Sequence, residues 1–245
     1  MAKSAGASSA PHDTPTPAAA RRLRVWDLPT RLFHWTLAAS VIASIVTAKV
    51  GGNATVWHFR LGYLAFALLS FRLLWGVMGG HWSRFGAFVY GPGALWRYLR
   101  GASRAEDRFD IGHSPLGSLS VWALLLLLAL QVATGLVADD EIANVGPLNR
   151  FVSGALASQA TGYHKAIGQW VLIGLVVLHV GAVLFYLLHK RRNLVAPMLH
   201  GDKVLESDVP ADLPPSRDTA ATRLLALGLF AACAAGVAWV VSLGG

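Results

Sequence analysis

Charged residues are scarce in this chain, and cysteine is almost absent. Only 14% of the 245 residues are charged and 54% are hydrophobic, whereas about a quarter of the residues of a soluble domain are charged. These proportions argue against a water-soluble globular enzyme. The single cysteine, Cys233, excludes an internal disulfide, a cysteine-rich zinc site, a thiolate-bound iron–sulfur cluster and covalent c-type haem attachment. A redox cofactor would therefore depend on other side chains, and nine histidines are present.

Acidic residues are also few, since 13 Asp and Glu accompany 21 Lys and Arg and leave a net charge of +8. The bases are confined to particular segments, which favours contact with a membrane surface and argues against nucleic acid. The first 22 residues are rich in Ala, Ser, Pro and Thr and lack the apolar core of a signal peptide. We expect residues 1–23 to be a disordered cytoplasmic tail.

Long apolar runs dominate the rest of the chain. A helix needs about 20 residues to cross a hydrocarbon core of about 30 Å, and five stretches come near that length. They lie at about residues 32–50, 57–79, 117–138, 165–188 and 221–242. The sequence therefore predicts an all-α membrane protein with five transmembrane helices.

The distribution of Lys and Arg predicts the orientation, because these residues are retained on the cytoplasmic side. Most of them lie in or beside the tail, the 80–116 connection and the 189–220 connection. We therefore expect a cytoplasmic N-terminus and a periplasmic C-terminus. The outer connection, 139–163, contains the short apolar run GPLNRFVSGALA, for which an interfacial segment and a short helix are both compatible.

Four histidines fall within the predicted helices, where an imidazole is costly to bury and is a functional candidate. His34 and His179 share the cytoplasmic level, and His58 and His164 share the periplasmic level. His164 and His179 are separated by about 22 Å along an α-helix, which suits two cofactors at two depths of one membrane.

Two imidazoles are enough to hold a haem iron but not a zinc ion. A structural zinc usually takes four protein ligands and a catalytic zinc three, and neither level offers a Cys, Asp or Glu within the helices. Haem iron takes two axial ligands, so each pair predicts one non-covalent haem b.

Glycine follows two of these histidines at the same spacing. Gly62 lies four residues after His58, and Gly168 lies four residues after His164. Residues four apart share a helix face, so each glycine would make room for a porphyrin. Ordinary helix packing is the alternative for each of them.

Arg72 is placed 14 residues beyond His58, about 21 Å deeper and about 40° away around the helix. At that depth it would pair with a propionate of the cytoplasmic-side haem, although a side chain that reaches the headgroups is also compatible. His81 and His113, in the 80–116 connection, either contact that propionate or only form local hydrogen bonds. Gln131 and Thr134 either line a quinone pocket or bond between helices.

Several stretches resemble the prokaryotic cytochrome b-561 family and the related b-type cytochrome subunits of nickel–iron hydrogenases. They are RVWDLPTRLFHW (Arg24 to Trp35), FRLLWGVMG (Phe71 to Gly79), GHSPLGSLSVWALLLLLALQVATGL (Gly112 to Leu136) and the pattern from His164 to His179. The resemblance covers about residues 24–190. It implies a four-helix transmembrane bundle that holds two haems b, and its implied axial ligands are His34, His58, His164 and His179.

The resemblance also implies a multi-pass protein of the bacterial inner membrane. Residues 24–190 would form the di-haem bundle, 191–220 a cytoplasmic loop, and 221–245 a fifth transmembrane helix that the four-helix plan lacks. Three functions are compatible with these residues. They are electron transfer between quinone and a redox partner, anchoring of a larger oxidoreductase, and haem-free proton-coupled transport.

The expected partners are the lipid membrane, quinone or quinol, and a periplasmic redox protein such as a c-type cytochrome or an oxidoreductase. Asp139, Asp140 and Glu141 open the outer connection, where they would steer a basic patch on that protein. Simple solvation of a loop is the alternative for these three acids.

Overall fold

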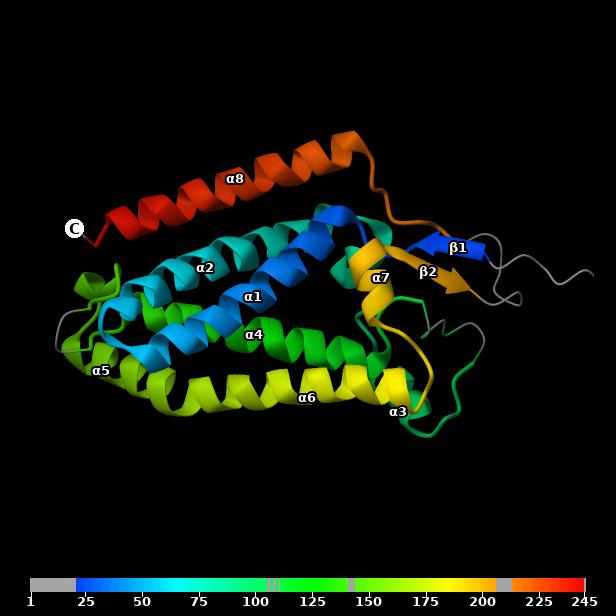
Figure 1. Ribbon diagram of the computed structural model, residues 1–245, viewed down its shortest axis with the longest axis horizontal. Coiled ribbons are helices and arrows are strands. Elements are labelled where there is room, and N and C mark those ends of the chain that lie inside the picture. The colour runs from blue at the N-terminus through cyan, green and yellow to red at the C-terminus, as the bar shows by residue number, and fades with distance from the viewer. Residues whose placement is uncertain are drawn as a thin grey trace, which may run out of the picture.

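The computed structural model describes residues 21–104, 107, 109, 111–140, 144–205 and 213–244. Within these ranges, five helices are long and apolar enough to cross a membrane (Figure 1): Leu28–Val50, Gly52–Met78, Pro115–Val137, Gly154–Leu188 and Ala220–Ser242. The five expected segments are thus confirmed. The fourth begins at Gly154 instead of about residue 165, because the apolar run after residue 146 is itself helical in part.

The spans are built from five long helices and some short turns: α1 (Leu28–Val50), α2 (Thr55–Met78), α4 (Pro115–Val137), α6 (Gln169–Leu188) and α8 (Ala220–Ser242). The turn η1 (Gly52–Ala54) precedes α2, and α5 (Gly154–Gly162) leads through the π-helical turn η6 (Tyr163–Gly168) into α6. Capping side chains set three of the helix starts. Asp27, Ser114 and Thr219 each accept a backbone N–H three residues further on.

The short elements divide between the two ends of the bundle (Figure 1). At one end, here called the sheet end, β1 (Arg21–Arg24) pairs antiparallel with β2 (Asp202–Leu205), beside α3 (Pro92–Leu99) and α7 (Val195–His200). The turns η2 (His81–Ser83) and η3 (Phe85–Ala87), which follow α2 in the chain, also lie at this end. At the other end, here called the α5 end, lie α5, η5 (Asn149–Phe151) and the C-terminus.

The sheet changes two expectations about the connections. Residues 21–23, assigned to the tail, belong to β1, because their backbone pairs with residues 203–205. The connection at 191–220 is not a plain loop, since it contains α7 and β2. The rest of the expected tail, residues 1–20, lies outside the described residues.

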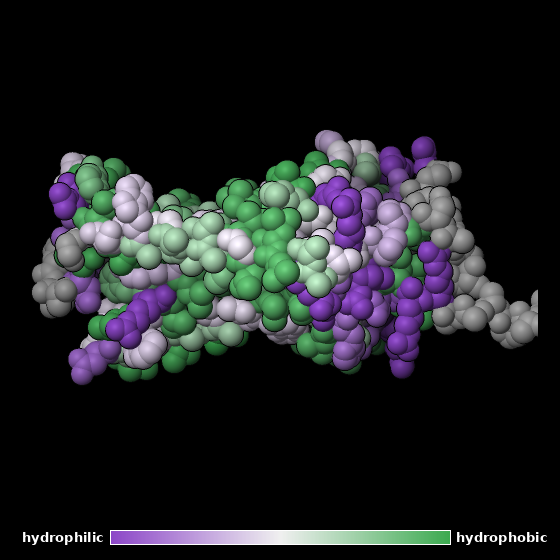
Figure 2. Space-filling model, turned by 90° about the horizontal axis from the view of Figure 1, so that it is seen from above, coloured by the Kyte–Doolittle hydropathy of each residue, from purple (hydrophilic) through white to green (hydrophobic). Residues whose placement is uncertain are grey.

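Large apolar side chains remain exposed along α6 and α8, among them Val177, Leu178 and Leu227. Figure 2 shows apolar surface around the middle of the molecule and hydrophilic residues gathered towards its ends, most densely at the sheet end. Lipid covers an apolar surface of this extent in a membrane protein, where all backbone polar groups of a span are bonded within the helix. The chain is therefore a multi-pass membrane protein.

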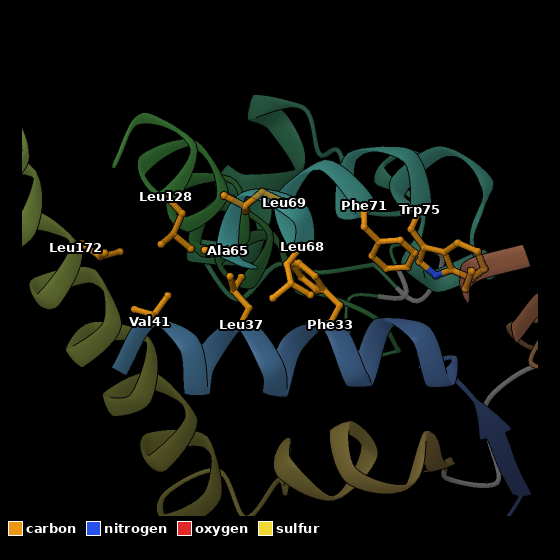
Figure 3. Packing of buried hydrophobic residues seen from close by; sticks show 11 residues of the cluster. Phe33, Leu37, Val41, Ala65, Leu68, Leu69, Phe71, Trp75, Leu128 and Leu172 are labelled. Carbon is orange, nitrogen blue, oxygen red and sulfur yellow. The ribbon is translucent and has the colours of Figure 1, made fainter. Parts of the chain in front are cut away.

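The buried core lies between α1 and α2 and reaches α4, α6 and α8. Figure 3 shows its labelled members: Phe33, Leu37, Val41, Ala65, Leu68, Leu69, Phe71, Trp75, Leu128 and Leu172. Phe71 stacks on Trp75 at 5.6 Å and meets Phe230 of α8 edge-on at 6.1 Å. The fifth span therefore packs along α2.

A buried carboxylate joins α1 to the segment after α2. Asp27 is fully buried, and its two oxygens accept four hydrogen bonds, from Thr30 N at 2.8 Å, Trp75 Nε1 at 3.1 Å, Gly80 N at 3.0 Å and Ser83 Oγ at 2.8 Å. A Cβ at Gly80 would lie 2.5 Å from an Asp27 oxygen, so the chain approaches this carboxylate as only glycine can.

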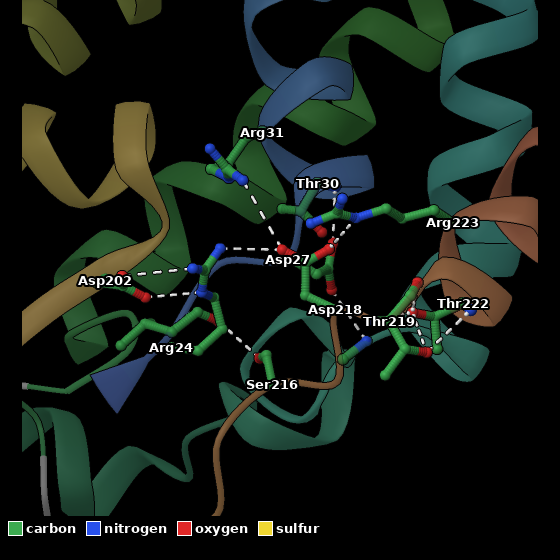
Figure 4. Close-up of polar contacts among 12 residues, drawn as sticks. Arg24, Asp27, Thr30, Arg31, Asp202, Ser216, Asp218, Thr219, Thr222 and Arg223 are labelled. Atoms are coloured by element: carbon green, nitrogen blue, oxygen red, sulfur yellow. Dashed lines mark hydrogen bonds and ion pairs between the residues drawn. The ribbon is translucent and has the colours of Figure 1, made fainter. Parts of the chain in front are cut away.

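A second carboxylate, Asp218, ties α8 to the sheet end (Figure 4). It forms ion pairs with Arg24 at 2.9 Å, Arg223 at 2.9 Å and Arg31 at 3.8 Å, and its side chain is 6% exposed. Burial works to raise the pKa of this carboxyl. Hydrogen bonds from Arg223 and the Leu28 backbone, with the charges of Arg223 and Arg24, outweigh burial and lower the pKa.

We expect Asp218→Asn to lower the thermal midpoint of the detergent-solubilised protein by about 2–6 °C, because three arginines lose their shared partner. Asp202→Asn is the matched control, since Asp202 contacts Arg24 and is 31% exposed. Because the pKa of Asp218 is lowered, its contribution is present above the unfolded value of 3.8 and is lost as the pH falls through the folded value. Equal midpoints for the two variants at pH 7 would contradict the central role of Asp218.

Candidate functional site

The four histidines singled out in the sequence meet in two pairs. His34 of α1 faces His179 of α6 with ring centres 6.4 Å apart, and His58 of α2 faces His164 of η6 with ring centres 5.9 Å apart. The first pair lies towards the sheet end and the second towards the α5 end. The partners in each pair come from helices far apart in the chain.

These separations suit one metal atom between two imidazoles. With metal–nitrogen bonds of about 2 Å, as in zinc–histidine sites, two rings on opposite sides of a metal have centres about 6 Å apart. No group of three or more His, Cys, Asp or Glu side chains suited to a metal ion occurs among the described residues. The donor set therefore fits a haem iron, which takes two axial ligands, better than zinc.

Hydrogen bonds orient both rings at the α5 end. His58 Nδ1 lies 2.9 Å from the Ser44 carbonyl, and His164 Nδ1 lies 2.9 Å from the Gln131 carbonyl. A carbonyl oxygen only accepts, so each Nδ1 carries the proton and each Nε2 keeps its lone pair for a metal. Metal-binding histidines are commonly oriented in this way.

Side chains of the neighbouring helices add to this arrangement. Thr134 Oγ1 lies 3.2 Å from His164 Nδ1, and Gln131 Nε2 donates to the His164 carbonyl at 3.3 Å. Of the two alternatives for Gln131 and Thr134, bonding between helices is therefore observed, and Gln131 also lines the cavity at this end. Ser44 is a site residue that the sequence did not indicate: its carbonyl and its Oγ, 3.0 Å away, both lie beside His58 Nδ1. A serine on α1 could be matched with a histidine on α2 only through the tertiary packing of the two helices.

The π-helical turn places His164. Six residues, Tyr163–Gly168, form η6, and its wider winding breaks the 3.6-residue period between α5 and α6. The regular α-helix assumed for the separation of about 22 Å between His164 and His179 therefore does not extend through this turn. Single π-helical turns are frequent at functional sites.

A cavity of about 500 Å³ opens between the rings at the α5 end, within the range of about 300–1,000 Å³ that holds small molecules and cofactors. Its lining includes Ser44, His58, Gly62, Leu128, Gly135 and His164. The lining also includes the charged residues Lys49, Asp140 and Lys165.

The glycines at this cavity differ in their surroundings. A Cβ at Gly62 would meet nothing within 4 Å, and a Cβ at Gly135 would lie 3.2 Å from His164 Cε1. A Cβ at Gly168 would collide with the side-chain oxygen of Gln131. Gly62 therefore borders open space, whereas Gly168 packs against α4. Gly135 was not indicated by the sequence, since it follows no histidine in the chain.

Arg72 lies towards the sheet end and is 4% exposed. Its Nη2 donates to the Ser83 carbonyl at 3.0 Å, and its guanidinium lies 4.6 Å from the centre of the Phe85 ring. This burial argues against the alternative in which Arg72 reaches the lipid headgroups.

His113 belongs to the same region, although it precedes α4 by two residues. Its ring lies 4.7 Å from that of Trp26 and 4.5 Å from that of Phe88. Burial, with smaller effects from Arg72, His34 and His179, lowers the pKa of His113 to about 3. The imidazole is therefore neutral at pH 7 and has one N–H to donate.

Two of the three acids expected to steer a partner lie at the α5 end. Asp140 accepts hydrogen bonds from the backbone and the side chain of Asn144, and the backbone N–H of Asp139 donates to Thr161. Glu141 lies outside the described residues.

Residues 25–201 match the family model described as prokaryotic cytochrome b561. The chain belongs to this family. It is therefore a membrane b-type cytochrome, and haem b is the cofactor that the family implies.

Named relatives are identical to this cytochrome at about a quarter of the aligned residues. A protein of Bradyrhizobium diazoefficiens named "Probable Ni/Fe-hydrogenase B-type cytochrome subunit" is 25% identical over 212 residues, which are 73% of this chain and 85% of the relative. Proteins with this name in Cupriavidus necator and with a corresponding name in Escherichia coli are 26% and 23% identical, over 72% of this chain and 85% and 88% of the relatives. No solved structure matches the cytochrome.

We expect Gly62→Leu to lower the haem content of the cytochrome without destabilising the protein part, because the new side chain enters the cavity and its Cβ meets no protein atom within 4 Å. Gly228→Leu is the control, since a Cβ there also meets nothing within 4 Å and Gly228 lies on α8. Gly168→Leu should lower stability as well, through its collision with Gln131. The reduced-minus-oxidised spectrum and the thermal midpoint check these outcomes, and full haem content in Gly62→Leu would contradict them.

Proposed function

We propose that this chain is a di-haem cytochrome that carries electrons across the membrane between the quinone pool and a redox partner. The observation that carries the proposal is the pair of facing imidazoles at each end of one bundle, with ring centres 6.4 and 5.9 Å apart. His34 and His179 would ligate one haem b, and His58 and His164 the other. Membership of a b-type cytochrome family supports the cofactor.

Bound by two imidazoles, haem b supplies one-electron chemistry and leaves no open position on iron for oxygen or substrate. The protein then has three tasks: to hold the ligands, to orient them and to exclude water. The carbonyls of Ser44 and Gln131 orient His58 and His164 through their Nδ1 protons. Gly62 would let the porphyrin approach α2, whereas the expected porphyrin contact of Gly168 gives way to its packing against Gln131 of α4. The core between the two levels would keep water out.

The partner side of the proposal is the α5 end. With a cytoplasmic N-terminus, this end faces the periplasm of an inner-membrane protein, where Asp139, Asp140 and Glu141 would steer a basic surface. The relatives named as hydrogenase b-type cytochrome subunits support a hydrogenase-like oxidoreductase as the partner. Membrane anchoring of that partner is compatible with electron transfer and is a second part of the same role.

Alanine variants of the four histidines test the ligand pairs. His34→Ala and His179→Ala should both remove the same haem, and His58→Ala and His164→Ala the other, because each iron needs both ligands of its pair. His200→Ala is the control. A redox titration of the α-band with pyridine haemochrome quantification identifies which haem is lost. Variants of one pair that affect different haems would exclude the pairing, and wild-type protein without a b-type spectrum would favour the haem-free transporter.

Arg72 would pair with a propionate of the haem at the sheet end, where it is buried beside Phe85. We expect Arg72→Leu to lower the reduction potential of that haem, because a nearby positive charge favours the ferrous form. Arg72→Lys should keep the reduction potential of that haem close to the wild-type value, because lysine retains the positive charge. Arg60→Leu is the control, since Arg60 lies near the start of α2 with its guanidinium 4.9 Å from the centre of the Trp57 ring. Unchanged potentials in Arg72→Leu would remove Arg72 from the haem site.

A further inference from the structure

We propose that His113 donates a hydrogen bond to a propionate of the sheet-end haem and that, with Arg72, it forms an anion cradle at that site. The inference rests on the proposed function, because it deepens the description of the His34–His179 site. It adds a residue from the connection between α2 and α4 to a site that is otherwise built from spanning helices.

The cradle is indicated by buried nitrogen atoms that lack hydrogen-bond partners. Among the described residues, these include Arg72 Nη1, His113 Nδ1 and His34 Nδ1. A buried polar atom left without a partner costs about 1–3 kcal/mol, so native proteins rarely keep one unless a water molecule or a ligand satisfies it. His34 is already assigned to the iron, but Arg72 Nη1 and His113 Nδ1 are left towards the same end of the bundle and indicate a ligand that accepts hydrogen bonds.

The charges around Arg72 indicate that this ligand is an anion. Asp27 is the acid that acts electrostatically on Arg72, but its oxygens already accept hydrogen bonds from Thr30, Trp75, Gly80 and Ser83. Arg72 itself donates to the Ser83 carbonyl, and no ion pair between Arg72 and a carboxylate is found in the described part of the chain. A buried guanidinium in this state favours a carboxylate ligand.

His113 is held rigidly enough to select the position of such a carboxylate. Its ring contacts Trp26 and Phe88, and its carbonyl accepts the Tyr90 hydroxyl at 2.7 Å. Because the neighbouring rings fix the imidazole, little side-chain entropy is lost when Nδ1 donates a hydrogen bond. Haem b has two propionates. Arg72 and His113 would therefore bind one carboxylate each or share one of them.

His81 provides a matched comparison in the same connection. Its ring packs edge-on against Trp82 at 4.9 Å, and the residue is half-buried. The unpartnered buried atoms include no nitrogen of His81 among the described residues. His113, not His81, is therefore the propionate contact.

The test uses the full-length cytochrome with both haems bound and the variants His113→Phe, His113→Gln and His81→Phe. Phenylalanine keeps the contacts with Trp26 and Phe88 but removes the N–H, whereas glutamine keeps a donor. Haem transfer to apomyoglobin measures release from each site, and the redox-induced infrared difference spectrum of haem labelled with carbon-13 at its propionates reports the hydrogen bond directly.

We expect His113→Phe to release the sheet-end haem about tenfold faster or more and to shift the propionate carboxylate band. The other haem should be unaffected, and His113→Gln should retain part of the wild-type behaviour. An unchanged band and release rate in His113→Phe, or equal loss of both haems, would overturn the inference. Wild-type protein that binds no haem would instead refute the proposed function.

Discussion

The whole arrangement depends on a constraint of about 6 Å between imidazoles that are far apart in the chain. His34 must face His179, and His58 must face His164, so α1 and α2 have to be fixed relative to α4 and α6 before any cofactor is held. The buried carboxylate of Asp27 contributes to this by joining the start of α1 to Trp75 and the segment after α2. At the other end, the carbonyls of α1 and α4 orient the rings directly.

Much of this architecture could be predicted because the membrane imposes simple rules on sequence. A span must be apolar over about 20 residues, so five spans could be recognised without knowledge of their packing. An imidazole in such a span is conspicuous, and its depth follows from the helical rise, which matched His34 with His179 and His58 with His164.

The features that the sequence did not predict depend on contacts that residue type does not encode. A regular period cannot reveal the π-helical turn at Tyr163–Gly168, since it is a change in backbone winding. The difference between Gly62 and Gly168 arises from where Gln131 of α4 lies. The strand at Arg21–Arg24 forms only because residues 202–205 return to pair with it. Each of these features follows from tertiary contacts.

The two ends of the bundle therefore impose different fields on their ligand pairs. At the α5 end, the Nδ1–H groups of His58 and His164 donate to carbonyls, which would make these rings more basic ligands and favour ferric iron in the proposed haem. At the sheet end, His34 Nδ1 has no such partner within the protein, and the buried charge of Arg72 would favour ferrous iron in the proposed haem. In the proposed di-haem arrangement both differences act in one direction, because each makes the sheet end the more favourable place for an electron. The same burial that isolates Arg72 from water thus also gives its charge a long range within the bundle.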